Sequence, residues 1–223
     1  AILLNQGKIL EHGEPKKIVN LYLDLLFGKK VNPKEKSEIT ITAVDLEKQA
    51  HHEELNATFE TRPYYSSGEY RWGDREAEIV DFVLFQEKNK FPSSLRLNKH
   101  ITLEFRVRFK KEILIPIFGF AVKTKEGVTI YNTNSDVQKG TGVSSVSAGN
   151  EWFVTVSLPM ILSSGDYFIS VGIASKSISG EIIPHDRRYD SIHLLVEATP
   201  EFTGLVDLSA KISVEVVSHD RTT

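Results

Sequence analysis

From residue 76 onward, the chain alternates apolar and polar positions with a period of two. Successive side chains of a β-strand point to opposite faces of the sheet, so each alternating run predicts a strand with one buried face. The run at 100–109 has apolar residues at its odd positions and polar residues at its even ones. Similar alternation occurs at 152–158, 167–174, 192–196 and 206–216.

Short turn sequences separate these runs, and no helical pattern lies between them. Many closely spaced strands with a single apolar face each indicate an all-β protein, an antiparallel β-sandwich. The turn at Ser163–Asp166 further predicts that the runs 152–158 and 167–174 pair as an antiparallel hairpin.

The first 28 residues follow a different pattern. Two short apolar runs flank Gln6-Gly7 and predict a hairpin, and apolar residues at three- and four-residue steps then predict a helix from Pro15 to Phe27 that stops at Gly28. A hairpin and one helix cannot bury their own apolar face, so we expect residues 1–28 to belong to a larger domain.

A charged stretch without clear periodicity separates the two parts and predicts a linker over 29–50. Within it, 39–49 could instead extend the helix or form a short strand. The sandwich is then expected over 51–223.

Composition narrows the possible partners. The net charge of −3 among 223 residues gives no basic surface for nucleic acid and no polybasic signal for an anionic bilayer. The absence of cysteine rules out a disulfide framework. No stretch approaches the roughly 18 apolar residues of a membrane-spanning helix.

The opening segment resembles the last hairpin and helix of an ABC-transporter ATPase domain. The residues that carry this resemblance are Leu3–Ile9, Gly13-Glu14-Pro15, Ile18-Val19 and Tyr22. The phosphate-binding loop G-x-x-x-x-G-K-[ST] does not occur, so we expect this chain neither to bind nor to hydrolyse ATP.

The remainder resembles the C-terminal domain of Wzt-type ATPases, which serve O-antigen polysaccharide exporters. The matching blocks are Tyr70–Asp74 with Ala77–Ile79, Pro116–Phe120 with Gly127, Ile130–Asn134, Gly165–Phe168 with Val171-Gly172, and His185-Asp186 with Tyr189-Asp190. The resemblance implies an immunoglobulin-like sandwich that binds the exported polysaccharide at the cytoplasmic face of the inner membrane. It also implies a transmembrane partner subunit, and a homodimer that exchanges an edge strand, for which Val206–Val217 is the best candidate.

Polysaccharides are bound by exposed aromatic rings and by polar groups that reach the sugar hydroxyls. Alternation places Phe153 and Thr155 on the outward face of one strand, and Phe168 and Ser170 on that of the next. The predicted hairpin would bring Phe153 near Gly172 and so form a shallow trough with aromatic rims. The alternative is that a loop or a partner subunit covers both rings.

Tyr131, Asn132 and Asn134 form a second carbohydrate-binding candidate, because two amides beside an aromatic ring can bond hydroxyls in several directions. Ordinary turn chemistry explains the asparagines equally well. Trp72 could be a stacking platform, but its place beside glycine and a charge pair favours a packed anchor at the edge of the core, and the position of Trp152 also favours burial.

Two polar clusters invite a metal or anion interpretation. The first could bind an anionic sugar or a metal, although a loop with internal ion pairs is favoured; its members are His185, Asp186, Arg187, Arg188 and Asp190. The second, His51-His52-Glu53-Glu54, lacks the i, i+4 histidine spacing of a zinc helix. We therefore expect no metal, no cofactor and no catalytic residue.

Three functions remain open from the sequence. A polysaccharide-binding module is favoured, because no pair of carboxylates stands in a glycosidase motif and no nucleophile elbow occurs. The alternatives are a glycan-processing enzyme and a dimerisation or docking module without a ligand.

Overall fold

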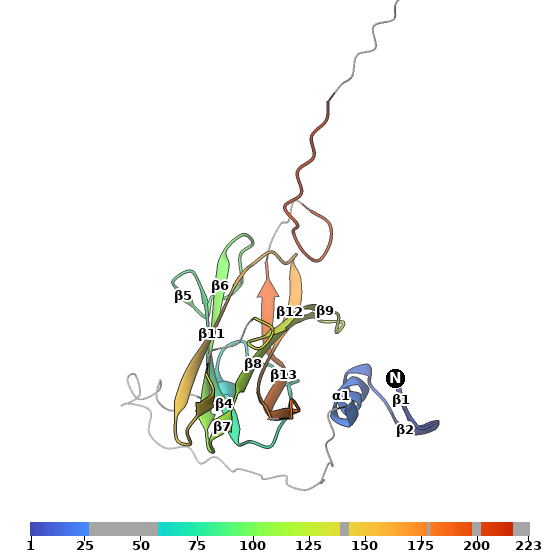
Figure 1. Ribbon diagram of the computed structural model, residues 1–223. Helices are drawn as coiled ribbons and strands as arrows, with labels where there is room; N and C mark the ends of the chain where they lie inside the picture. The colour runs from blue at the N-terminus through green and yellow to red at the C-terminus, as the bar shows by residue number, and fades with distance from the viewer. Residues whose placement is uncertain (27–57, 139–142, 178, 198–201, 216–223) are drawn as a thin grey trace, which may run out of the picture.

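The computed structural model describes residues 1–26, 58–138, 143–177, 179–197 and 202–215. Its main body is a sandwich of two antiparallel sheets (Figure 1), which confirms the predicted all-β sandwich. The predicted linker at 29–50 and the His51–Glu54 cluster lie outside the described residues.

One sheet has four strands in the order β11-β6-β4-β5. Their bounds are β11 (Glu151–Pro159), β6 (His100–Phe109), β4 (Ala77–Gln86) and β5 (Asn89–Lys90). In β6 every odd-numbered side chain is buried, as the alternation predicted. Even-numbered β11 residues are half-buried and pack on the core, so Trp152 faces inward as expected.

The second sheet has five strands in the order β3-β13-β12-β8-β9. They are β3 (Tyr70–Trp72), β13 (Ile182–Val196), β12 (Gly165–Lys176), β8 (Pro116–Thr124) and β9 (Thr129–Asn134). A short sheet pairs β7 (Ile113–Leu114) with β10 (Ser145–Val146), and a 3-10 turn, η1, covers Phe59–Thr61.

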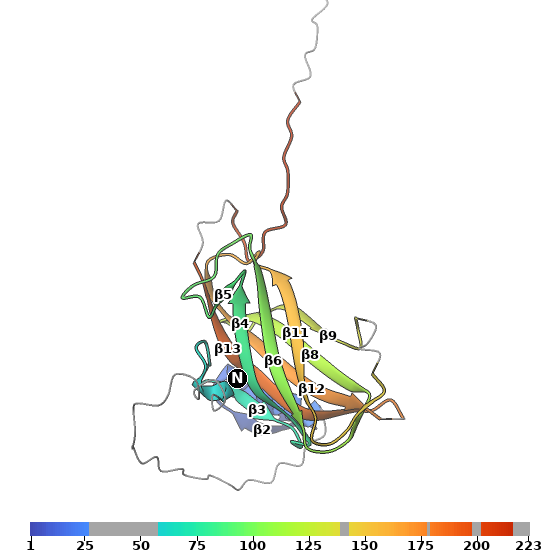
Figure 2. The ribbon, with the colours of Figure 1, turned by 90° about the vertical axis from the view of Figure 1, so that its left-hand side faces the viewer.

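Figure 2 shows the two sheets one in front of the other. Their inner faces meet in one apolar core. The four-stranded sheet contributes side chains such as Phe82 and Phe105, and the five-stranded sheet contributes Phe120 and Ile169. Burial of such large side chains stabilises the fold by about 1.5–3 kcal/mol each.

The predicted hairpin between β11 and β12 is wrong. β11 pairs with β6, and β12 lies between β13 and β8 in the other sheet. Met160 and Leu162, in the connection after β11, insert into the core, so the chain crosses from one sheet to the other instead of turning back. The proposed trough between Phe153 and Phe168 therefore does not exist, because the two rings lie on opposite outer faces of the sandwich.

The predicted loop around residues 185–190 is also wrong, because these residues belong to β13. The inward positions of this half of the strand carry charged side chains, Asp186 and Arg188, which are fully buried. Because these inward residues are charged, this part of β13 lacks the alternation of apolar and polar residues by which the other strands were predicted.

The N-terminal segment forms the expected hairpin and helix: β1 (Ile2–Asn5), β2 (Lys8–His12) and α1 (Pro15–Leu26). Gln6 and Gly7 both have positive φ, as a two-residue hairpin turn requires. The predicted helix end at Phe27 and Gly28 falls outside the described residues. In the parts of the chain that the structure describes, no helix is long and apolar enough to cross a membrane.

Candidate functional site

Small side chains occupy the centre of the outer face of the five-stranded sheet. Gly172 of β12 lies beside Gly119 of β8, and Ser170 lies beside Ala121, so four small residues are neighbours on two adjacent strands. We call the outer face of this sheet the small-residue face. Side chains from the flanking strands β13 and β9 can therefore extend over its centre.

Aromatic rings border one side of the small-residue face. Tyr70 and Tyr189 are cross-strand neighbours whose parallel rings have centroids 6.5 Å apart. Trp72 is buried and packs against Tyr189 at 6.3 Å, which confirms its expected role as a packed anchor. The tyrosines remain partly exposed beside the small residues.

Phe168 also lies on the small-residue face, half-buried, with its outward orientation as predicted. Its ring stacks on His193 at 5.0 Å, and His193 Nε2 lies 2.7 Å from Asp166 Oδ1. The Phe168 ring is thus held by His193 of β13, which Asp166 of β12 holds in turn.

Ser170 shares this face but is only 5% exposed, which corrects its assignment as a contact residue. Its Oγ accepts a hydrogen bond of 2.9 Å from the backbone N–H of Asp190, a residue held at φ +52°. Lys123 Nζ lies 3.4 Å from the Asp190 carboxylate. Ser170 therefore positions Asp190, and the Lys123–Asp190 pair forms the surface above it.

The asparagines lie at the opposite border of the small-residue face, on edge strand β9. Asn132 pairs with Ala121 and is exposed, while Asn134 pairs with Gly119. Asn134 Oδ1 accepts a hydrogen bond of 2.9 Å from the N–H of Val137, so this residue also has the turn role that was the alternative. Asn132 is the better placed of the two to contact a ligand.

Phe153 and Thr155 are exposed on the outer face of the other sheet, and Phe153 has 72% of its surface accessible. Their cross-strand neighbours are Arg106 and Glu104. Arg106 Nη1 is bonded to Glu151 at 2.9 Å. This surface is polar apart from the exposed ring of Phe153, and it shares no residue with the small-residue face.

Tyr131 faces away from Asn132, because adjacent strand residues point to opposite sides. It lines an open groove of about 710 Å³ between the edges of the two sheets, which we call the edge groove. Its walls are largely apolar, with Val154, Val156 and Leu158 from β11 facing residues of β8 and β9. Tyr131 is thus separated from Asn132, whereas Asn134 also lines the edge groove.

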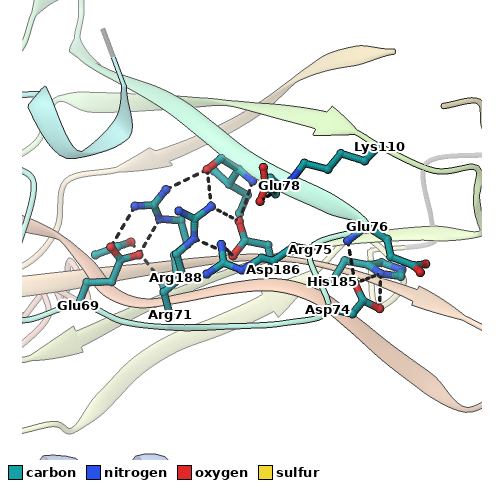
Figure 3. A network of polar contacts seen from close by, with 12 residues as sticks. Glu69, Arg71, Asp74, Arg75, Glu76, Glu78, Lys110, His185, Asp186 and Arg188 are labelled. Atoms are coloured by element: carbon teal, nitrogen blue, oxygen red, sulfur yellow. Dashed lines mark hydrogen bonds and ion pairs between the residues drawn. The ribbon is translucent and has the colours of Figure 1, made fainter. Parts of the chain in front are cut away.

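A network of charges lies inside the sandwich, beneath the small-residue face (Figure 3). Arg188 is fully buried and bonds Glu69 through Nε at 2.6 Å, while its guanidinium lies 3.5 Å from the centre of the Phe59 ring. Buried Asp186 accepts bonds from Arg71 at 2.7 Å and Arg75 at 3.0 Å. The Arg71–Asp186 pair joins β3 to β13, and the backbone of Ile79 in β4 bonds both Asp186 and Arg188, so the network has a structural role.

Three possible metal ligands gather beside this network. Donor atoms of Asp74, Glu76 and His185 lie within 4.8 Å of one another. His185 already uses Nδ1 with Asp74 at 2.9 Å and Nε2 with Ser175 at 2.9 Å. Glu76 pairs with Lys111. Because each group already has a protein partner, the geometry is satisfied without a metal.

The two packed antiparallel sheets define the class of fold as a β-sandwich. The comparisons identify its family: residues 68–208 match the family described as the Wzt C-terminal domain. The chain belongs to this family. Its fold is a non-catalytic binding fold, consistent with a carbohydrate-binding role in ABC transporters.

One solved structure agrees with this assignment. The crystal structure of the C-terminal domain of Wzt is 36% identical, with a TM-score of 0.66, and the match covers 70% of this chain and 95% of that one. A CARDB domain from Pyrococcus furiosus has only a low similarity, at 10% identity and a TM-score of 0.28 over 56% of this chain and 100% of that one. No curated protein sequence matches the chain.

Proposed function

We propose that the chain binds O-antigen polysaccharide as the cargo of an ABC exporter, and that the small-residue face is the binding surface. The observation that carries the proposal is the arrangement of this face in a member of the Wzt C-terminal domain family. Aromatic rings lie on one side of the small residues and amides on the other.

The chemistry of the small-residue face suits a saccharide. Tyr70 and Tyr189 offer ring surface for sugar C–H groups, and Asn132 offers both donors and an acceptor for hydroxyls. Phe168 is fixed by stacking and loses little conformational freedom when a ligand binds. A flexible polymer on an open surface is expected to bind weakly at each site, because ordering it costs entropy.

The Phe153 surface is the weaker candidate. A single exposed ring is common on protein surfaces and needs no ligand to explain it. The neighbouring Arg106 and Glu151 already pair with each other. In this proposal, Phe153 and Thr155 would contribute only through a second, separate contact with the polymer.

We further propose that the chain forms a homodimer by exchanging its C-terminal segment. Residues 205–207 pair with 161–163 through the bridge between Leu162 and Val206, and the chain then extends away from the sandwich (Figures 1 and 2). Beyond that bridge, Leu208, Ile212 and Val214 are 84–91% exposed. Alternating apolar residues in an unpaired segment call for a sheet edge to cover them.

The edge groove of a second copy provides that cover. The β11 edge is unpaired on its outer side in the described structure, and its inward residues are apolar. An exchanged segment would extend the four-stranded sheet and place its apolar side in the groove, near Tyr131. Such reciprocal exchange closes with two-fold symmetry and gives a dimer.

The remaining parts of the proposal rest on the resemblance of the N-terminal segment to an ATPase end. We infer that residues 1–28 pack with an ATPase domain, and that the exporter's transmembrane subunit is a partner at the cytoplasmic face of the inner membrane. Several apolar side chains of this segment are exposed, as such packing would require; they are Ile2, Leu4, Ile9, Leu10, Val19, Tyr22 and Leu25.

A binding screen against O-polysaccharides of different serotypes tests the proposed function. With the polymer that binds, Asn132→Ala should weaken affinity about 3- to 10-fold, the value of one lost hydrogen bond. Phe168→Ala should weaken it by at least as much. Phe153→Ala, the matched control on the opposite face, should change affinity less than twofold, as measured by isothermal titration calorimetry.

Other outcomes would favour the alternatives. If no polymer produces a thermal or chemical shift at millimolar repeat-unit concentration, a docking module without a ligand is the better account. Shortening of the polymer during incubation would show a hydrolase.

A further inference from the structure

Two adjacent arginines of β13 point to opposite sides of the five-stranded sheet. Arg188 points inward and is bonded by Glu60 and Glu69. Arg187 points outward, beside Gly172 on the small-residue face. Within the described residues no carboxylate pairs with Arg187, and its buried Nε has no hydrogen-bond partner.

The glycines determine how Arg187 lies. A Cβ added to Gly172 would be 2.9 Å from Arg187 Cδ and 3.3 Å from Nη1. One added to Gly119 would be 3.6 Å from the same Nη1. The side chain therefore extends from β13 across β12 to β8, in the space that these two glycines leave. Its guanidinium lies on the row of cross-strand neighbours that ends at Asn134.

No neighbouring carboxylate among the described residues balances the positive charge of Arg187. Asp190, on the same strand, is engaged by Lys123 and by Ser170. Burial lowers the pKa of Arg187, which the nearby Tyr189 opposes only in part. A buried N–H group without an acceptor, such as Arg187 Nε, is costly, and such groups in native proteins call for an explanation, such as an ion or ligand that binds there.

We propose that Arg187 binds an anionic group of the polysaccharide, a carboxylate or a phosphate, so that the cargo of this chain is an acidic glycan. This inference rests on the proposed function of the small-residue face and adds the chemical class of its ligand. The planar guanidinium presents paired N–H donors that match the oxygens of either group. Asn132 and the tyrosines would then hold the sugar that carries the charge.

Monosaccharide probes test the inference with the full 223-residue chain. Glucuronate, glucose 6-phosphate and glucose are titrated separately while amide chemical shifts are followed. We expect at least one charged probe to bind about tenfold or more tightly than glucose. Preference for glucuronate would identify a carboxylate as the anionic group, and preference for the phosphate ester would identify a phosphate.

Arg187→Gln should remove this preference, so that charged and neutral probes bind alike. Arg96→Gln is the matched control, because Arg96 is exposed elsewhere and the charge change is the same. Urea unfolding of both variants separates loss of binding from loss of structure.

The glycines supply a second pair of variants that keep every charge. Gly172→Ala forces Arg187 to move and should lower the affinity for the charged probe about as much as Arg187→Gln. Gly119→Ala makes only an ordinary contact and should leave it unchanged. Loss of affinity in both variants, or in neither, would contradict the assigned position of the guanidinium.

The experiments distinguish failure of the Arg187 inference from failure of the proposed function. Binding of neutral and charged probes with equal affinity, or a charge preference that survives Arg187→Gln, overturns this inference and leaves the proposed function standing. Absence of any response to these probes overturns the inference, and absence of binding in the O-polysaccharide screen overturns the proposed function itself.

Discussion

Arg188→Met is expected to lower the free energy of unfolding by about 3–5 kcal/mol, the usual cost of removing one partner from a buried ion pair. Arg188 has no exposed surface, and its partner Glu69 is also buried, with 6% of its side chain accessible. Without Arg188, the Glu69 carboxylate stays in a low-dielectric site without its counter-charge. The carbonyl of Ile79 also loses a donor at 2.9 Å. Urea denaturation measures the change.

Arg108→Met is the matched control, because Arg108 forms its pair with Glu151 at the surface, where such pairs contribute about 0–1 kcal/mol. Equal destabilisation by the two variants would contradict a structural role for the buried network. It would indicate that the buried ion pairs of Arg188 contribute no more to the free energy of unfolding than an ordinary surface pair does.

The pH dependence of the Arg188 effect gives an independent check. Burial alone would raise the pKa of Glu60, but the hydrogen bond and charge of Arg188 outweigh it and lower this pKa below the ordinary 4.5. A carboxylate with a lowered pKa contributes stability that is present above the ordinary value and is lost as pH falls through the folded-state value. The difference in stability between the native chain and Arg188→Met should therefore shrink below about pH 4.5.

The double variant Leu208→Asp/Ile212→Asp is expected to weaken the proposed dimer at least about 100-fold. Each apolar side chain contributes about 1.5–3 kcal/mol when it is buried, and every 1.4 kcal/mol corresponds to a tenfold change in affinity. In the described chain both side chains are almost fully exposed. Light scattering after size-exclusion chromatography, over a dilution series, measures the monomer–dimer equilibrium.

Ser209→Asp/Ser213→Asp is the matched control. It adds the same two charges to the same segment, but at positions of opposite parity, which would face solvent in an exchanged strand. This variant should remain dimeric. The exchange proposal would be wrong if the native chain is monomeric at high micromolar concentration. It would also be wrong if the control dissociates as much as the Leu208→Asp/Ile212→Asp variant.

Alternation predicted the faces of the strands well because most strands bury one apolar side. β6 is the clearest case, since its inward residues are all apolar and buried. The outward positions of Phe153 and Phe168 followed from the same rule and are confirmed. A period of two identifies which side of a strand is buried, and this was sufficient to predict the orientation of these side chains.

Strand partners were not predictable in the same way, because periodicity does not state which strand lies beside which. The turn at Ser163–Asp166 suggested a hairpin, yet the apolar stretch Met160–Leu162 before it belongs to the core and carries the chain across the sandwich. That stretch was the available signal, since a tight hairpin loop has no need of three consecutive apolar residues.

Arg187 could not be distinguished from its neighbours in sequence, because β13 carries charges on both of its faces at this point. Arg188 and Asp186 both point inward, and each forms an ion pair with a residue far away in the sequence, Glu69 and Arg71 respectively. Only the register of β13 with β12 places Arg187 over Gly172. The inward position of Arg188 thus depends on Glu69, 119 residues earlier in the chain, while the outward position of Arg187 depends on strand pairing with β12.

Residue-resolved mapping of polysaccharide binding by amide chemical shifts, with the O-polysaccharide selected in the screen, tests the central claim most directly. The account predicts the largest shifts at Asn132, Gly172 and Arg187, with Phe153 unaffected. Largest shifts around Phe153, or within the edge groove at Tyr131, would contradict it.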